Sequence, residues 1–260
     1  MTTFKSMQAI ELKPVTVIKL GGSLLENLTS SFYREIARKT QSGQRVVIVH
    51  GGGPAINRQL ADRKLTSEVK NGLRVTSPEA MEVVQSTLIG LVNPSLVHSL
   101  SSAGIRAAGL NGFDDQMLTC SYLDQEVYGC VGEIQTVKTE LIQTLLQGGF
   151  VPVVSCIGKT KDGAALNVNA DTVASKIALA LHAESLLLVT DTDGIKLSGK
   201  TQNDLTPEAI QKAISSGEIY GGMIPKVHAA FDCLEAGVPA VHIVGESLQG
   251  TQISQEVKIP

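Results

Sequence analysis

The stretch VTVIKLGGS, residues 15–23, decides the fold class. Its first six residues, Val15–Leu20, form a short and nearly continuous apolar run, which is typical of a strand buried on both faces of a sheet. Helical patterns lie between this run and the others like it, so the sequence predicts an α/β protein, a three-layer αβα sandwich around a mainly parallel sheet. The similar runs are Arg45–His50, Ile105–Leu110, Val151–Cys156, Ser185–Thr190 and Ala240–Val244.

Two further kinds of segment separate these predicted strands. Arg63–Thr76 is polar with a turn at Asn71-Gly72, and Phe113–Val137 is rich in Gly and Asp, so both predict hairpins or lids beside a site rather than core. Thr206-Pro207 offers a helix N-cap followed by proline at the first helical position. The best helical patterns are Ser77–Ala103, Thr139–Gln147, Ala170–His182, Thr206–Ser215 and Pro225–Ala236.

Composition narrows the function classes. The 260 residues are 43% hydrophobic, enough for a core without metals or disulfides. Aromatic residues make up only 3% and the net charge is -3, which argues against a nucleic-acid partner. The four cysteines form no CxxC pair, which predicts reduced thiols and a cytoplasmic location. With no signal-like N-terminus and no apolar run of about 18 residues, no membrane association is expected.

Two glycine-rich loops follow predicted strands. Gly21-Gly22 comes directly after Val15–Leu20, and Gly51-Gly52-Gly53 follows Arg45–His50. Consecutive glycines let backbone N–H groups approach an anion closely, and a following helix adds the positive end of its dipole. A single loop of this kind is often an ordinary turn. Because ligands of open α/β sheets bind at the carboxyl ends of the strands, the pair predicts an anion site at that edge.

Two lysines and one aspartate are candidates for handling phosphate. Lys19 interrupts an apolar strand, and a half-buried ammonium needs an anionic partner; the alternative is a strand-end lysine that reaches water. Lys226 lies at the start of a predicted helix, where the helix dipole disfavours a cation. A cation at this position is nevertheless well placed to bind a phosphoryl group. Asp171 follows Asn167 and Asn169, which lie on one side of an extended segment. These three residues either cap a helix or hold a polar ligand and pair with lysines.

Signatures of other enzyme classes are missing. The sequence has no GxxxxGK[ST] loop, no GxGxxG followed by an acid at the expected spacing, and no GxSxG, HExxH or protein-kinase signature. The five histidines show no metal-ligand spacing, so no metal site is predicted. We interpret His182 and His242 as structural.

The motifs occur in an order that resembles the amino acid kinase family. VIKLGGSLL, VIVHGGGPAI, KNGLRVT, LNVNAD, LVTDTDGI and GGMIPKV follow one another between Val15 and Ile253. The sequence is identified as a member of that family, in the branch that acts on N-acetyl-L-glutamate. The resemblance implies the amino acid kinase fold with two lobes. Residues 1–180 would bind the amino-acid substrate and form a dimer, and residues 181–260 would bind ATP.

The resemblance also implies a role for each site residue. Lys19 and Lys226 match two lysines that bind the transferring phosphoryl group, and Asp171 matches the aspartate that holds both lysines. The matches to the amino-acid site are Gly52, Gly53, Arg74 and Asn167. The matches to segments that border the phosphates or the nucleotide are Gly21, Gly22, Asp191, Gly194, Ile195, Lys196, Gly221, Gly222 and Met223.

The implied reaction moves the terminal phosphoryl group of ATP to the side-chain carboxylate of N-acetyl-L-glutamate, the second step of arginine biosynthesis, with Mg²⁺ carried mainly by the nucleotide. The carboxylate is already ionised at pH 7, so no general base is needed. Arg74 suits a bidentate grip on the α-carboxylate, and Asn167 offers a donor and an acceptor to the acetamido group.

Three segments depart from the family pattern. Asn93-Pro94 stands where an Asn-Lys pair is common, His228 stands where Asn is common, and Asn111–Gln116 replaces an Asp-Gly pattern. These differences bear on substrate selectivity more than on the reaction.

Other functions remain open on these motifs. A kinase acting on carrier-protein-bound aminoadipate or on glutamate would share them, and a nucleoside monophosphate kinase would share the glycine loops. A non-catalytic amino-acid or nucleotide sensor would be expected to have lost a lysine or Asp171. The resemblance associates arginine feedback with an additional N-terminal helix and a hexamer, so the short segment before the first strand favours an arginine-insensitive homodimer. Ser77–Ala103 is the candidate interface.

Overall fold

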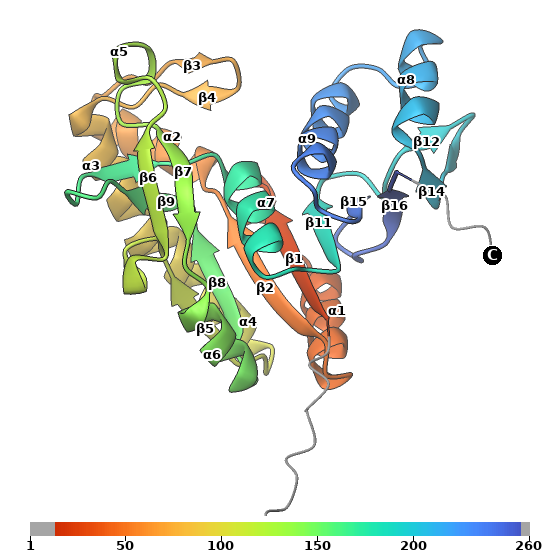
Figure 1. Ribbon diagram of the computed structural model, residues 1–260, viewed down its shortest axis with the longest axis horizontal. Helices are drawn as coiled ribbons and strands as arrows, with labels where there is room; N and C mark the ends of the chain where they lie inside the picture. Colours follow the sequence, from red (N-terminus) through yellow and green to blue (C-terminus); the bar gives the residue numbers. More distant parts are fainter. Residues whose placement is uncertain (1–13, 256–260) are drawn as a thin grey trace, which may run out of the picture.

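An eight-stranded sheet forms the centre of the computed structural model, which describes residues 14–255 (Figure 1). The strand order is β14-β16-β15-β11-β1-β2-β8-β5, and all neighbours from β15 to β5 run parallel. Only β16 and β14, at one edge, run the opposite way. The predicted α/β class with a mainly parallel sheet is confirmed. The strands are β1 (Val15–Leu20), β2 (Arg45–His50), β5 (Ala107–Leu110), β8 (Val151–Ser155), β11 (Ser185–Val189), β14 (Asp204–Leu205), β15 (Val241–Val244) and β16 (Gly250–Ile253).

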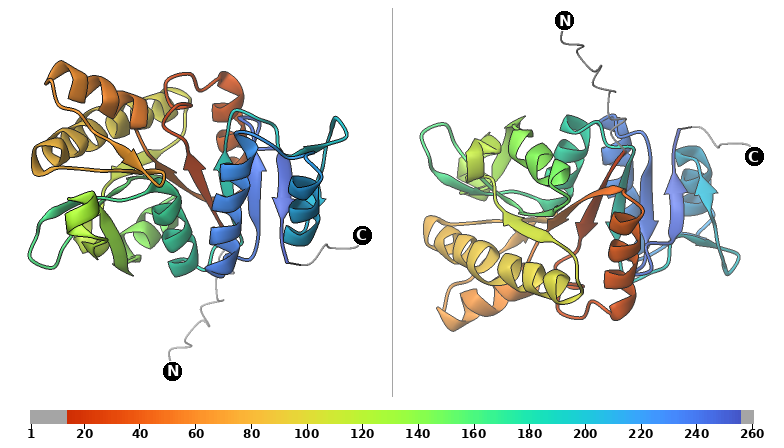
Figure 2. Two further views of the ribbon diagram at one scale, coloured as in Figure 1. Left: turned by 90° about the horizontal axis from the view of Figure 1, so that it is seen from above. Right: turned by 90° about the horizontal axis from the view of Figure 1, so that it is seen from below.

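Helices cover both faces of this sheet (Figure 2). Alternate residues of β1 belong to different apolar clusters: Val15 and Val17 pack in the cluster that contains α7, whereas Ile18 and Leu20 pack with α1. Lys19 is two residues after Val17 in the strand, so its side chain points to the same face of the sheet, the one that α7 covers. The helices of that face include α6 (Glu140–Gln147), α7 (Ala170–Ala180) and α9 (Met223–Glu235), and those of the other face are α1 (Ser30–Gln41) and α4 (Asn93–Ser102).

A second sheet of four strands, in the order β10-β9-β6-β7, was not predicted. Within Phe113–Val137, β6 and β7 pair antiparallel around the short helix α5, so the predicted hairpin is confirmed. The expectation that this segment lies outside the core is wrong, because Leu118, Cys120 and Ile134 are buried. The elements are α5 (Gln125–Tyr128), β6 (Leu118–Tyr122), β7 (Gly132–Val137), β9 (Ile157–Lys159) and β10 (Ala165–Asn167).

The hairpin predicted at Asn71-Gly72 is present. It joins β3 (Val69–Lys70) to β4 (Leu73–Arg74), and both turn residues have positive φ, 52° and 77°. Two successive positive φ values match a two-residue turn that follows the twist of the strands. The hairpin places Arg74 at the start of the segment that returns to the protein body.

The predicted helix Ser77–Ala103 has an unpredicted break. It consists of α3 (Pro78–Thr87), a π-helical turn η1 (Leu88–Val92) and α4. Pro94 has no N–H for the carbonyl of Gly90, and the wider turn accommodates that missing bond. Pro78–Ser102 is long and apolar enough to pass as a membrane span, yet half of its most apolar stretch is buried in this protein.

Two more of the predicted helices are present. The Thr206 side chain accepts a hydrogen bond from the backbone N–H of Ala209, as expected of an N-cap. Pro207 is the first residue of α8 (Pro207–Ser215), as predicted. Helix α9 begins at Met223, two residues earlier than expected, because Pro225 is tolerated within a first helical turn. The other elements are α2 (Gly53–Asp62), the 3-10 turn η2 (Asp114–Gln116), β12 (Lys196–Leu197) and β13 (Lys200–Thr201).

The expected lobe boundary at residues 180/181 falls between α7 and β11. Four strands of the main sheet lie on each side of this boundary in the sequence, and they meet where β1 pairs with β11. One apolar cluster runs through both halves, from Val15 to Ile253. The two-lobe division of function therefore stays a prediction.

Candidate active site

The two glycine loops meet at the carboxyl ends of β1 and β2. These strands are parallel neighbours with Leu20 opposite His50, so both loops start at the same level of the sheet. A side chain at Gly22 would place its Cβ 2.6 Å from the Gly53 nitrogen and 3.1 Å from the Gly52 nitrogen. Only glycine fits there, and the close approach makes a cradle of backbone N–H groups. The loops are thus brought together as expected.

Lys19 lies at this cradle and pairs with Asp171. Its Nζ is 2.9 Å from Asp171 Oδ1, and the two side chains are 18% and 30% exposed. Asp171 is fixed by the start of α7, where the Asn169 side chain accepts from the backbone nitrogens of Asp171 and Thr172 at 2.8 and 3.1 Å. Asn169 is therefore a helix cap, and its capping holds the carboxylate that holds Lys19.

Lys226 has a different partner from the one that the resemblance implied. Its ammonium forms an ion pair with Asp191, in the loop after β11, and not with Asp171. The Lys226 ammonium lowers the pKa of the Asp191 carboxyl through a hydrogen bond and its charge. Lys226 is 26% exposed whereas Asp191 is 75% exposed. The expectation that one aspartate holds both lysines is wrong for this structure, because each lysine has its own carboxylate.

Arg74 and Asn167, predicted to hold the amino acid, are joined through Thr76. Asn167 Nδ2 donates to Thr76 Oγ1 at 3.2 Å, and Thr76 Oγ1 donates to the Arg74 carbonyl at 2.8 Å. The Arg74 side chain donates to Asn57 Oδ1 at 2.5 Å, and burial lowers its pKa. A guanidinium stays charged even so, and a partly desolvated one favours an anionic partner.

A cavity of about 650 Å³ borders the C-terminal half of the sheet. Five of the residues predicted to border the nucleotide line it, and Gly221 and Gly222 lie between two of its lining residues, Tyr220 and Met223. Sequence reasoning missed Ser198, Glu218 and the exposed Tyr220, although Tyr220 adjoins the Gly221-Gly222 pair and is one of only four tyrosines. The five predicted residues are Asp191, Gly194, Ile195, Lys196 and Met223.

A second cavity, of about 380 Å³, lies between α7 and α9. Asn71 and Leu73 of the hairpin, Asp171 of α7 and Ala229 of α9 all line it. The hairpin and the carboxylate that holds Lys19 therefore face a common space. Among residues 14–255 no group of three or more His, Cys, Asp or Glu side chains is placed to hold a metal ion.

The family model described as the amino acid kinase family matches residues 14–245. The chain belongs to the amino acid kinase family. The acetylglutamate kinase of Bacillus velezensis is 40% identical over 254 residues, which cover 94% of this chain and 98% of that enzyme.

Solved structures of amino acid kinase fold proteins are also similar. The crystal structure of smu.665 from Streptococcus mutans UA159 has a TM-score of 0.82 and 34% identity, and the match covers 93% of this chain and 99% of that one. The carbamate kinase of Giardia has a TM-score of 0.69 at 15% identity, over 94% of this chain and 99% of its own, which shows the shared fold alone.

Proposed function

We propose that this chain phosphorylates N-acetyl-L-glutamate, the activity named for its curated relatives. ATP would supply the phosphoryl group, and the product would be the acyl phosphate N-acetyl-L-glutamyl 5-phosphate, in the second step of arginine biosynthesis. One observation carries the proposal. Lys19, held by Asp171, lies at two interlocked glycine loops, and Asp171 faces the same cavity as the hairpin that leads to Arg74.

The chemistry fits this arrangement. Phosphoryl transfer needs positioning and charge stabilisation more than covalent help from the protein. The Lys19 ammonium and the backbone N–H groups of the glycine loops would supply positive charge where the transferring group carries negative charge. Asp171 keeps Lys19 in place, and Asn169 keeps Asp171 in place. The acceptor carboxylate is ionised at pH 7 and attacks without a general base.

The acceptor would lie between the hairpin and the strand end β10. The Arg74 guanidinium would bind its α-carboxylate, exchanging or sharing the bond that it now makes to Asn57. Asn167 would bind the acetamido group, since its Oδ1 remains available while Nδ2 donates to Thr76. Gly52 and Gly53 would face the carboxylate that is phosphorylated.

The nucleotide would occupy the cavity of about 650 Å³ in the C-terminal half. Its phosphates would compete with Asp191 for Lys226, because a polyphosphate carries more negative charge than one exposed carboxylate. Mg²⁺ would travel on the phosphate oxygens, since this cation prefers oxygen ligands and keeps several waters.

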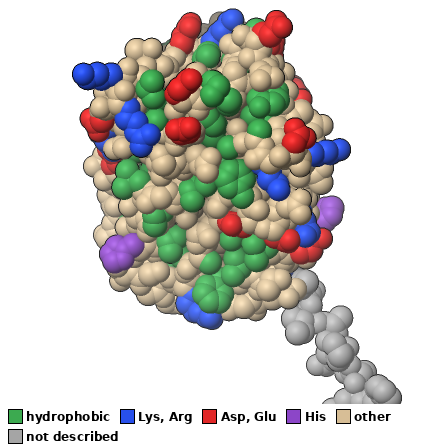
Figure 3. All heavy atoms as spheres, turned by 90° about the vertical axis from the view of Figure 1, so that its left-hand side faces the viewer, with side chains coloured by type: hydrophobic (Ala, Val, Ile, Leu, Met, Phe, Trp, Pro, Cys, Tyr) green, Lys and Arg blue, Asp and Glu red, His purple; other side chains and the backbone are tan. Residues whose placement is uncertain are grey.

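We also propose a cytoplasmic homodimer with Pro78–Ser102 in its interface. Leu91, in the π-helical turn of this segment, is large, apolar and exposed. Figure 3 views the end of the molecule on the left of Figure 1, where α3 lies, and shows hydrophobic side chains in a broken band down that face. The molar mass in solution tests the interface. We expect a dimer for the wild type and a monomer for Leu91→Glu, and an unchanged mass in the variant would contradict this interface.

The test of the reaction is an acceptor panel. ADP release is measured with N-acetyl-L-glutamate, glutamate, aspartate and UMP side by side, with Asp171→Asn as a control of nearly the same size. We expect release with N-acetyl-L-glutamate that is lost in the control. Release with glutamate alone or with UMP alone would contradict the proposed acceptor, and release that survives in the control would contradict the proposed site.

A further inference from the structure

His50 is the last residue of β2 and the first of the glycine loop His50–Pro54. Its side chain is completely buried. Because Lys19 pairs with Val49 and Leu20 pairs with His50, the His50 ring lies on the opposite face of the sheet from Lys19. The ring therefore reaches the loop from the face opposite to Lys19, and its contact there is with the Gly51 carbonyl oxygen.

The hydrogen bonds of the ring define its protonation. Asn93 Nδ2 lies 2.8 Å from the Val153 carbonyl oxygen and 2.9 Å from His50 Nε2. Since a carbonyl oxygen only accepts, the Asn93 nitrogen faces both partners and donates to each. His50 Nε2 is then an acceptor, and Nδ1 donates to the Gly51 carbonyl oxygen at 2.9 Å. The ring is neutral, and burial lowers its pKa to about 4.

Asn93 is itself held firmly. It is buried at the first position of α4, directly after the π-helical turn. A side chain at Gly109 of β5 would place its Cβ 2.1 Å from Asn93 Oδ1, so this strand has room for the amide only because Gly109 is glycine. Asn93 thus ties the helix to β8 through Val153 and to β2 through His50.

The bond to Gly51 sets the direction of the next N–H group. In a trans peptide the carbonyl and the following N–H point in opposite directions. Because the Gly51 carbonyl points inward to the His50 ring, the Gly52 N–H points away from it. The Gly52 N–H group also lies beside the other glycine loop, because the Gly52 nitrogen would be 3.1 Å from a Cβ added at Gly22.

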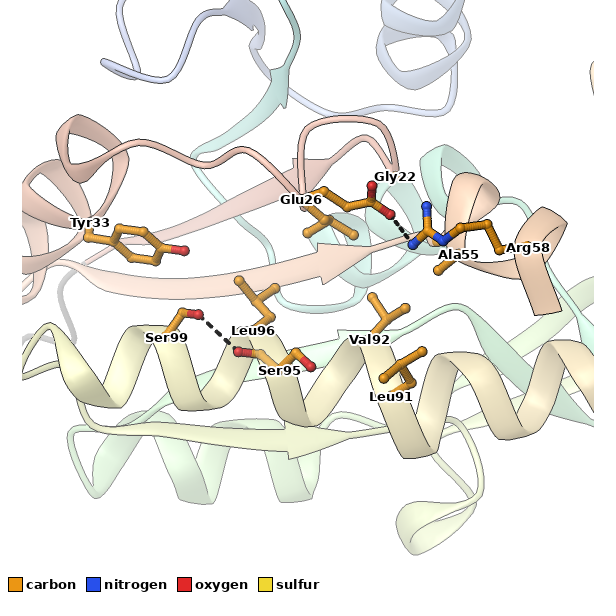
Figure 4. A pocket seen from close by; sticks show the side chains of 12 residues that line it. Gly22, Glu26, Tyr33, Ala55, Arg58, Leu91, Val92, Ser95, Leu96 and Ser99 are labelled. Carbon is orange, nitrogen blue, oxygen red and sulfur yellow. Dashed lines mark hydrogen bonds and ion pairs between the residues drawn. The ribbon is translucent and has the colours of Figure 1, made fainter.

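Gly52 is packed tightly on one side and borders a cavity on another. Leu88 closes one side of Gly52, where an added Cβ would come within 2.6 Å of its Cδ2. Beside it, however, lies a cavity of about 230 Å³ that Gly22, Gly52 and Val92 line. Figure 4 shows Val92 and Leu96 pointing from the helix into this space. The ring bond therefore adds a constraint on this peptide to the one that Leu88 supplies.

We infer that His50 and Asn93 are positioning residues that aim the Gly52 N–H at the phosphoryl group during transfer. The inference rests on the proposed phosphoryl-transfer function. A hydrogen-bond donor aimed in advance at developing negative charge acts mainly on the rate of the chemical step. Its misdirection should lower kcat and leave the KM values of both substrates nearly unchanged.

Two polar variants separate positioning from mere burial. In His50→Asn the side-chain nitrogen can take the place of Nδ1 and donate to Gly51, whereas in His50→Gln the amide reaches toward Asn93 and leaves the Gly51 carbonyl without its donor. We expect His50→Gln to lower kcat about 100-fold. His50→Asn should recover most of that loss. His242→Asn, on β15 of the same sheet, is the matched control and should keep wild-type kcat.

A second measurement does not depend on turnover. The affinity for ADP with aluminium fluoride, a mimic of the transferring phosphoryl group, is measured by calorimetry in the presence of the acceptor. It should fall in His50→Gln by about the same factor as kcat, while the affinity for ADP alone stays unchanged. If His50→Gln does not fold, Asn93→Ser, which removes the support of the ring, should lower kcat and this affinity together.

Equal kcat values in His50→Gln and His50→Asn, or a rise in KM at unchanged kcat, would overturn the inference. So would an unchanged affinity for the aluminium fluoride complex. All ratios are taken with the acceptor that the wild-type enzyme phosphorylates. A wrong acceptor in the proposed function would therefore appear as an inactive wild type with N-acetyl-L-glutamate, and not as a lost difference between variants.

Discussion

The two lysines of the site sit in contrasting surroundings. Lys19 extends from a central strand to Asp171, a carboxylate that a capped helix holds and that is 30% exposed. Lys226 extends from the first turns of α9 to Asp191, a loop carboxylate that is 75% exposed. The first pair belongs to the sheet edge where the glycine loops meet, and the second borders the cavity of the C-terminal half.

This contrast indicates that the two halves differ in how firmly their charged side chains are held before substrates bind. In the N-terminal half, the loops, Lys19 and Asp171 are fixed by a helix cap and by the buried His50–Asn93 pair. In the C-terminal half, a solvent-exposed ion pair of small net stability holds Lys226. Phosphate can replace such a carboxylate readily. We therefore expect the first half to act as a fixed cradle and the second to rearrange around the nucleotide.

The largest expected effect is the loss of either lysine. Lys19→Ala and Lys226→Ala should each lower kcat by about 10²–10³, because in the proposed site each would remove a cation from the transferring group. The two variants should differ in thermal stability. Lys19→Ala leaves Asp171 partly buried without its partner and should lower Tm, whereas Asp191 is hydrated once Lys226 is removed. Steady-state kinetics and thermal unfolding check both parts; equal Tm losses would remove the contrast.

The next effect is a dependence of stability on pH. Burial lowers the pKa of His50 from 6.5 to about 4 in the folded protein. Between these values the unfolded chain binds more protons at His50, so stability falls as the pH falls. From pH 7 to pH 5 the free energy of unfolding should drop by about 2 kcal/mol through this residue. Urea unfolding of the wild type and His50→Asn at both pH values should show that difference, and parallel curves would refute it.

A smaller effect is expected at the hairpin. Arg74→Ala should raise KM for N-acetyl-L-glutamate about tenfold with little change in KM for ATP, because it would remove the proposed charge-assisted contact to the acceptor. Arg63→Ala, an exposed arginine at the end of α2, is the matched control and should leave both KM values alone. Initial-rate kinetics with each substrate varied decide the matter. An unchanged KM would place the acceptor elsewhere.

The smallest effect should come from Asp191. Asp191→Asn breaks an exposed ion pair, whose net worth is about 1 kcal/mol or less, so kcat should change by less than about fivefold. Asp171→Asn should lower kcat far more. Side-by-side turnover measurements of the two variants sharpen the comparison between the halves. Comparable losses would mean that Asp191 has a fixed role in catalysis.

Local signals predicted much of this molecule. Apolar runs such as Val15–Leu20 marked the buried strands because burial on both faces leaves no polar alternation. Asn71-Gly72 marked its turn because both residues tolerate positive φ. Helix α1 escaped notice, since Phe32 and Ile36 are its only fully buried residues.

Long-range contacts were harder to predict. The partner of Lys226 depends on how the loop after β11 meets α9, 35 residues further along the chain. The bond between His50 and Asn93 joins positions 43 residues apart, and it requires the glycine at position 109 on a third segment. Nothing in the local sequence of these segments indicates that they touch. The resemblance supplied the Lys19–Asp171 contact but gave Lys226 the wrong partner.

The most direct test of the central claim is to trap the product. An acyl phosphate reacts with hydroxylamine to form a hydroxamate, whereas phosphate esters and anhydrides of nucleotides do not. With ATP, Mg²⁺, N-acetyl-L-glutamate and hydroxylamine, we predict that hydroxamate and ADP form in equal amounts, and that Lys19→Ala forms neither at a comparable rate. ADP formed without hydroxamate, or product formed only with UMP, would contradict the account.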